Sequence, residues 1–97
     1  MTINEFKSKC ELPGQVFDDE ILQSLYLIKQ DNWDAAHNIA QDNHSKYGSL
    51  VHGLLHRIEG DQWNASYWYR QAGEPDLSGS IDELWEYIAK KYIASII

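Results

Sequence analysis

Two histidines and a glutamate at helical spacing are the side chains of this 97-residue chain whose types and positions could support chemistry. His52, His56 and Glu59 lie at i, i+4 and i+7, so a helix would align them on one face. Imidazoles one turn apart, with a carboxylate one turn further on, form the outline of a metal-ligand set. The helical wheel places the three beside an apolar stripe, so we expect them at the edge of a groove.

Two features of the sequence count against a metal site at this triplet. The zinc-protease motif needs a glutamate directly after the first histidine, and Gly53 stands there instead, so the general base is missing. A structural zinc site needs four ligands, often thiolates, and the fourth would have to be His37 or Asp61. The favoured interpretation is therefore semi-buried histidines that hydrogen-bond between neighbouring helices, and we predict no cofactor. Metal binding by the triplet, or ligand or catalytic use, stays open as the alternative.

A second polar group follows in the next predicted helix. Trp68 and Arg70 could clamp an anion or stack on a flat ligand. The simpler role for Arg70 is an ion pair with Glu59 or Asp61, which would secure the turn between the two helices. His37, between small residues, is expected to be packed with a satisfied nitrogen. The candidate ligand-binding residues are His37, His52, His56, Glu59, Tyr67, Trp68 and Arg70.

Apolar residues recur at helical spacing along most of the chain and predict an all-α fold. We expect one domain over residues 1–97, made of two stacked helical hairpins, at about 18–43 and about 48–74, and a C-terminal helix at about 81–96. The expected helices cover residues 19–30, 33–41, from 48 or 49 to 59, 62–72 and 81–96, with a further short one at 3–10. Capping residues support these bounds: Asp18, Asp61 and Ser80 as N-caps and Gly60 as a left-handed C-terminal residue.

The two predicted hairpins repeat each other at an offset of 30 residues. The matching pairs include Leu25 with Leu55, Asp31 with Asp61 and Trp33 with Trp63. Because turn residues match as well as apolar ones, we interpret the pattern as two stacked helix–turn–helix units that share a core. In this register His52 and His56 replace Leu22 and Tyr26, so a site, if the fold carries one, is expected where the symmetry breaks.

One stretch of about 45 residues carries a specific string of polar and small residues. The string comprises residues 34–41, Gly48–Ser49, His52, residues 56–59, Asp61, Asn64–Ala65, Tyr67–Trp68 and Arg70. It resembles a family of small uncharacterised bacterial proteins, which implies an all-helical fold and a bacterial source but no activity. The hairpins also bear a looser similarity to tetratricopeptide units, from which the shorter period departs.

Composition excludes several classes of function. The net charge of −7, from 15 acidic and 8 basic residues, argues against binding nucleic acid or an anionic membrane surface. No apolar run is long enough to span a bilayer, and residues 1–10 lack the apolar core of a signal peptide. Cys10 is the only cysteine, so no internal disulfide forms. We therefore expect a cytoplasmic protein.

The function that the sequence favours is a small helical interaction or scaffold protein without catalytic activity. It would bind a protein partner or a second copy of itself, with Trp85, Tyr92 and Ile96–Ile97 as the interface in a homo-oligomer. The alternative is a ligand-binding or metal-binding protein, or a small enzyme, that uses His52, His56 and Glu59. No catalytic residue is identified.

Overall fold

The computed structural model describes residues 1–96, in which six α-helices follow one another and no strand occurs. They are α1 (Ile3–Cys10), α2 (Glu20–Lys29), α3 (Trp33–Gln41), α4 (Lys46–Ile58), α5 (Gln62–Gln71) and α6 (Ile81–Ser95). The predicted all-α class is confirmed. No helix in residues 1–96 is both long enough and apolar enough to cross a bilayer.

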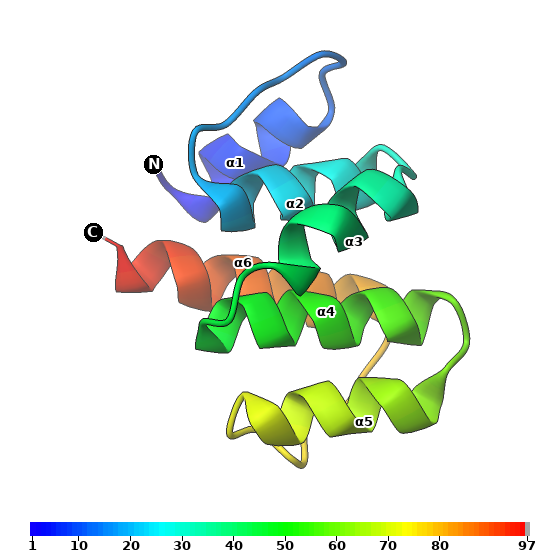
Figure 1. The fold of residues 1–97 in the computed structure, drawn as a ribbon. Coiled ribbons are helices and arrows are strands. Elements are labelled where there is room, and N and C mark those ends of the chain that lie inside the picture. Colours follow the sequence, from blue (N-terminus) through cyan, green and yellow to red (C-terminus); the bar gives the residue numbers. More distant parts are fainter. Residues whose placement is uncertain (97) are drawn as a thin grey trace.

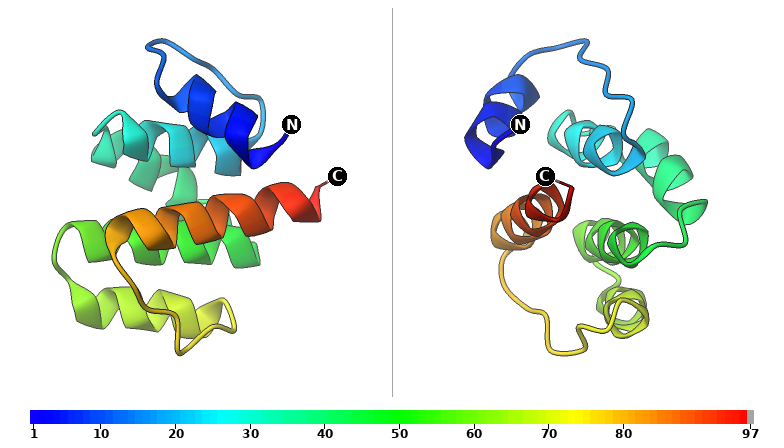
Figure 2. Two further views of the ribbon diagram at one scale, coloured as in Figure 1. Left: turned by 180° about the vertical axis from the view of Figure 1, so that it is seen from behind. Right: turned by 90° about the vertical axis from the view of Figure 1, so that its left-hand side faces the viewer.

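The helices form two hairpins, α2–α3 and α4–α5, joined by the packing of α3 on α4. Helix α6 runs back along α4 and also contacts α2, and α1 lies against α6 (Figure 1). Figure 2 shows that α1 and α5 lie at opposite ends of the molecule, with both chain termini on the same side. The central position therefore belongs to α4, which contacts helices on several sides and can bring their side chains together.

Local capping explains where the helices begin. Asp61 and Ser80 cap α5 and α6 as predicted, whereas Asp19, and not Asp18, caps α2 by accepting from two backbone N–H groups. Helix α4 begins at Lys46, before the expected 48 or 49, because the Ser45 side chain accepts the backbone N–H of Gly48. Each cap satisfies amide groups that have no partner within the helix.

The turns of the two hairpins recur at an offset of 29 residues, from 32 to 61 and from 27 to 56. The Asn32 N–H donates to the Leu27 carbonyl at 2.9 Å, and the Asp61 N–H donates to the His56 carbonyl at the same distance. The predicted 30-residue register is therefore wrong by one residue at the turns. His52 and His56 correspond to Gln23 and Leu27, and not to Leu22 and Tyr26.

The same offset pairs Asp31 with Gly60, the two turn residues that have positive φ, at 58° and 87°. Asp31 adopts the left-handed conformation that glycine adopts more readily, and aspartate is among the residues that tolerate it best. Trp63 then has no counterpart in Trp33. One residue rotates a side chain by about 100° around a helix, and Trp63 is consequently 77% exposed.

Both hairpins close at a small residue that faces a buried alanine. In the first, the Ser24 hydroxyl donates to the Ala36 carbonyl at 3.1 Å. In the second, a Cβ on Gly53 would lie 2.5 Å from a ring carbon of Tyr69 and 3.2 Å from the Ala65 carbonyl oxygen. The absence of a side chain at Gly53 therefore allows α4 and α5 to approach closely.

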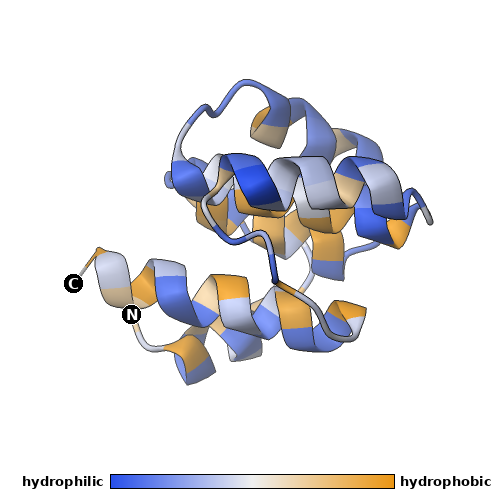
Figure 3. Cartoon of the chain, turned by 90° about the horizontal axis from the view of Figure 1, so that it is seen from below, coloured by the Kyte–Doolittle hydropathy of each residue, from blue (hydrophilic) through white to orange (hydrophobic). Residues whose placement is uncertain are grey.

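The core fills the space enclosed by α1, α2, α4 and α6, where apolar segments face one another (Figure 3). Trp85 is buried there: its ring stacks on Phe6, and its Nε1–H donates to the Leu25 carbonyl at 2.9 Å. The expectation that Trp85 contributes to an exposed oligomer interface is therefore wrong. Tyr92 is only partly buried and packs against the core, Ile96 is exposed, and Ile97 lies outside the described residues.

Candidate functional site

Three histidines converge where α3 crosses α4. His37 comes from α3, and His52 and His56 come from successive turns of α4. One ring nitrogen from each lies within 4.8 Å of the others. The closest approach is between the Nε2 atoms of His37 and His52, which are 3.1 Å apart. The helical spacing predicted that His52 and His56 share a face, and the crossing of α3 adds His37 to them.

Two tryptophans enclose the histidine cluster, which we define as His37, His52 and His56. The ring of Trp33 stacks on His37 with centroids 4.7 Å apart, and the ring of Trp68 stacks on His52 with centroids 4.1 Å apart. The Nε1–H of Trp33 donates to the Leu55 carbonyl at 2.7 Å, which fixes that ring. The two indoles limit the access of water to the imidazoles, and water exclusion strengthens electrostatic interactions there.

Glu59 lies outside the cluster but orients one of its members. Its Oε1 is 2.6 Å from Nδ1 of His56. Because an ionised carboxylate can only accept, Nδ1–H of His56 is the donor, and Nε2 of the neutral ring carries the free lone pair. Histidines that ligate metals characteristically donate their other nitrogen to a carboxylate in this way.

Burial keeps His52 neutral. The residue is only 8% exposed to solvent. Desolvation, with smaller contributions from the neighbouring imidazoles of His37 and His56, lowers the pKa of His52 from 6.5 to about 4. A neutral imidazole is the form that ligates metals. His52 is therefore ready to act as a ligand near neutral pH.

The distances in the cluster suit a first-row transition metal. Zinc–nitrogen bonds of 2.0–2.1 Å at tetrahedral angles place two ligating nitrogens about 3.3 Å apart. The distance between the His37 and His52 nitrogens, 3.1 Å, is close to this value. A ring nitrogen of His56 lies within 4.8 Å of both and is the third nitrogen of the set.

A second group of potential ligands adjoins the first and consists of His56, Glu59 and Asp61. Asp61 is already engaged, because its carboxylate accepts the backbone and side-chain N–H groups of Asn64 at 3.1 and 2.8 Å. These hydrogen bonds lower the pKa of Asp61. The carboxylate thus serves mainly as the N-cap of α5, which leaves the histidine cluster as the stronger candidate.

The remaining predicted residues contribute less to this site. Arg70 is exposed and forms no ion pair with Glu59 or Asp61 within residues 1–96, so the predicted ion pair at the turn is wrong. Both carboxylates have other partners. Tyr67 meets the ring of Trp68 edge-on at 5.1 Å and remains 40% exposed.

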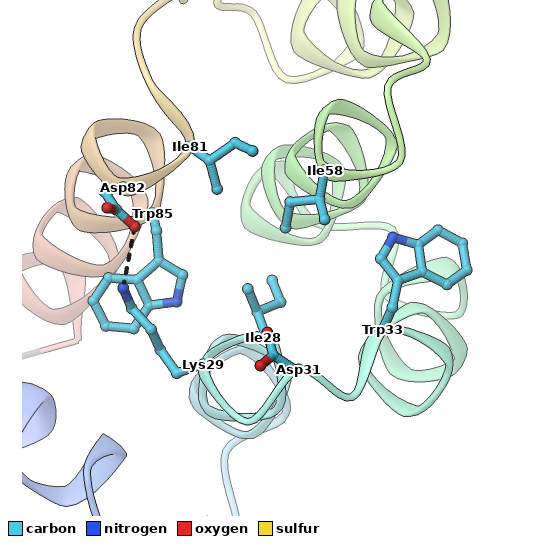
Figure 4. A pocket seen from close by; sticks show the side chains of 8 residues that line it. All are labelled: Ile28, Lys29, Asp31, Trp33, Ile58, Ile81, Asp82 and Trp85. Carbon is cyan, nitrogen blue, oxygen red and sulfur yellow. Dashed lines mark ion pairs between the residues drawn. The ribbon is translucent and has the colours of Figure 1, made fainter.

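Trp33 is a site residue that the sequence interpretation did not include. It precedes His37 by four positions, and this spacing was the available signal for a stacked pair on one helix face. Trp33 also borders a pocket of about 360 Å³ between α2, α4 and α6 (Figure 4). Isoleucines and Trp85 line that pocket, with the ion pair of Lys29 and Asp82 at its rim. The histidine cluster does not line it.

Comparisons with family models, with curated proteins and with solved structures found no match to this chain.

Proposed function

We propose that this protein binds a divalent transition-metal ion through His37, His52 and His56. The observation that carries the proposal is the convergence of three imidazole nitrogens from two helices within 4.8 Å. Two further features support it. Glu59 is hydrogen-bonded to His56 in the arrangement typical of an outer-shell carboxylate, and burial keeps His52 neutral. Glu59 thus acts as an orienting partner of His56 and not as a direct ligand.

The ligand set limits the choice of metal. Imidazole suits zinc, copper and nickel, whereas calcium and magnesium prefer oxygen ligands. The thiol of Cys10 is buried in the core formed around α1 and α6, so it is not a fourth ligand. Three protein ligands leave one coordination position for water or an exchangeable small ligand. The proposed function is therefore the binding of a zinc-like ion with one open position.

Calorimetric titration of untagged, chelator-treated protein with Zn²⁺ tests the proposal. We expect one ion per chain in the wild type and a loss of affinity of at least about tenfold in His37→Gln, because one coordinate bond is removed. His44→Gln is the matched control, since His44 is exposed in the loop before α4. Equal Zn²⁺ affinity in wild type and His37→Gln, or no change in melting temperature on adding Zn²⁺, would contradict the proposal.

A helical interaction module remains a second candidate function, and an exposed aromatic pair favours it. Trp63 and Tyr67 lie one turn apart on α5 and are 77% and 40% exposed. Exposed tryptophan and tyrosine are enriched in protein interfaces. Sedimentation velocity over a wide concentration range tests self-association. Concentration-dependent dimers that disappear in Trp63→Ser would support it, and a monomer at all concentrations would exclude the homo-oligomer.

A further inference from the structure

A separate pocket, lined by polar and apolar residues, lies where α4 and α5 meet the loop before α6. Its volume is about 210 Å³. It is lined by Arg57 of α4, Gln62 and Tyr69 of α5, Leu77, Ser78 and Gly79 of the loop, and Leu84 of α6. Neither the histidine cluster nor the two tryptophans stacked on it, Trp33 and Trp68, line this pocket. The pocket is therefore a separate structural feature.

The hydroxyl of Tyr69 is the first sign that this pocket is built for a ligand. Tyr69 is 2% exposed, and its Oη is buried with no hydrogen-bond partner within the described residues. Buried hydroxyls in folded proteins almost always have a partner. Burial also raises the pKa of Tyr69 to about 12, so the hydroxyl keeps its proton and can donate it to a ligand.

Arg57 supplies the positive charge. Its guanidinium is close enough to oppose the rise in the pKa of Tyr69. In residues 1–96 it forms no ion pair, and no carboxylate lines the pocket. On α6, Oε1 of Glu83 is engaged in the capping box, where it accepts the Ser80 N–H. A guanidinium without a carboxylate partner, next to a hydroxyl donor, has the chemistry that recognises oxyanions.

We infer that this pocket binds a small oxyanion, a carboxylate or a phosphate. Arg57 pairs with the anion, and Tyr69 donates a hydrogen bond to it once the side chains that cover its buried hydroxyl move aside. The amide of Gln62 and the hydroxyl of Ser78 offer further donors at the wall. The volume accommodates an anion of a few heavy atoms. Leu77 and Leu84 form an apolar part of the wall. The hydrocarbon tail of a short aliphatic carboxylate can pack against it, whereas inorganic phosphate has no such tail.

Titrations followed by ¹H–¹⁵N NMR test the inference in two arms, one with butyrate and one with inorganic phosphate. We expect saturable shifts of the Arg57 side-chain Nε–H and of amides in residues 77–79. Tighter binding of butyrate would identify a carboxylate site, and tighter binding of phosphate a phosphate site. No saturable shift with either anion at millimolar concentration would overturn the inference.

Two variants and one control locate the binding. Tyr69→Phe should lower the affinity for the anion by about tenfold, the typical effect of removing one hydrogen bond to a charged group. Arg57→Gln should abolish saturable binding. Arg70→Gln removes the same charge from the exposed face of α5 and should leave the affinity unchanged. Unaltered affinity in Tyr69→Phe would contradict the inference.

The anion-free protein gives an independent measurement. If the Tyr69 hydroxyl makes no hydrogen bond in the anion-free protein, its removal costs nothing. Without anion, Tyr69→Phe should therefore melt at the same temperature as the wild type or at a higher one. The wild type alone should then be stabilised by adding the anion. A marked loss of stability in anion-free Tyr69→Phe would show that the hydroxyl already has a partner, which would overturn the inference. Zn²⁺ binding should be unchanged in these variants, so the two sites can succeed or fail separately.

Discussion

The Nε2 atoms of His37 and His52 face each other at 3.1 Å across the contact between α3 and α4. Two imidazole nitrogens at this distance share either one proton or one metal ion, because two bare lone pairs would repel. His56 adds a third nitrogen, and Trp33 and Trp68 cover the outer faces of the other two rings. This relationship makes the histidine cluster sensitive to protons and to metals, and the first predictions follow from it.

The free energy of unfolding of the metal-free protein should fall as the pH falls from about 6.5 to about 4. The folded-state pKa of His52 is about 4, below the usual histidine value of 6.5. Above 6.5 both states are neutral at this site. Below pH 6.5 the unfolded chain binds a proton that the folded chain does not. The free energy of unfolding therefore falls, by about 2–3 kcal/mol near pH 4. Urea unfolding in chelator at several pH values measures it.

The same unfolding experiment on His52→Gln provides the control. Glutamine does not titrate, so the part of the slope that belongs to His52 should disappear. The difference in slope between the two proteins is the relevant quantity, because it isolates the contribution of His52. Identical slopes in both proteins would show that His52 is not held neutral by the fold.

Glu59→Gln should lower the Zn²⁺ affinity by about tenfold or more, the typical effect of removing an outer-shell partner. The amide can accept from Nδ1 of His56, but it lacks the negative charge that makes the imidazole more basic. Calorimetry measures the affinity, and ¹⁵N NMR of the metal-free protein measures the tautomer of His56. Glu11→Gln, at an exposed position after α1, should change neither. A His56 that carries its proton on Nε2 in the wild type would refute the assignment even without metal.

Copper binding should quench tryptophan fluorescence. Trp68 stacks on His52 and Trp33 stacks on His37, so a paramagnetic ion held by these imidazoles would lie close to both indoles. Stoichiometric Cu²⁺ should reduce the emission of the wild type, and less so in Trp68→Phe. Trp63→Phe serves as the control because Trp63 is exposed and belongs to none of the tryptophan–histidine ring pairs within residues 1–96. Equal quenching in all three proteins would place the copper elsewhere.

Gly53→Ala should destabilise the fold by about 1–3 kcal/mol, the usual cost of overpacking. A Cβ there would lie 2.5 Å from a Tyr69 ring carbon, so either the ring or the α4–α5 packing must shift. Ser49→Ala on the same helix introduces the same side chain without such a clash and should have a small effect. Thermal or urea unfolding compares the two, and equal stability would indicate that α5 adjusts without cost.

The sequence alone determined the features that depend on neighbours in the chain. Asp61 and Ser80 cap their helices and Gly60 ends α4 in a left-handed conformation, because these preferences act within one helical turn. The helical phase also placed His52 and His56 on one face. The repeat of two hairpins was visible, but its register was not: matching side chains favoured an offset of 30, whereas the turn hydrogen bonds follow 29.

Only the tertiary structure decided which side chains meet across helices. The approach of His37 to His52 depends on how α3 crosses α4, and the orphaned hydroxyl of Tyr69 depends on Gly53 opposite and on the loop before α6. Trp33 is fixed by its hydrogen bond to the Leu55 carbonyl. Trp63, which matches Trp33 when the chain is compared with itself at an offset of 30, is exposed. A shift of one residue rotates a side chain by about 100° on a helix, so packing of the hairpins, and not residue type, determined which tryptophan faces the histidines.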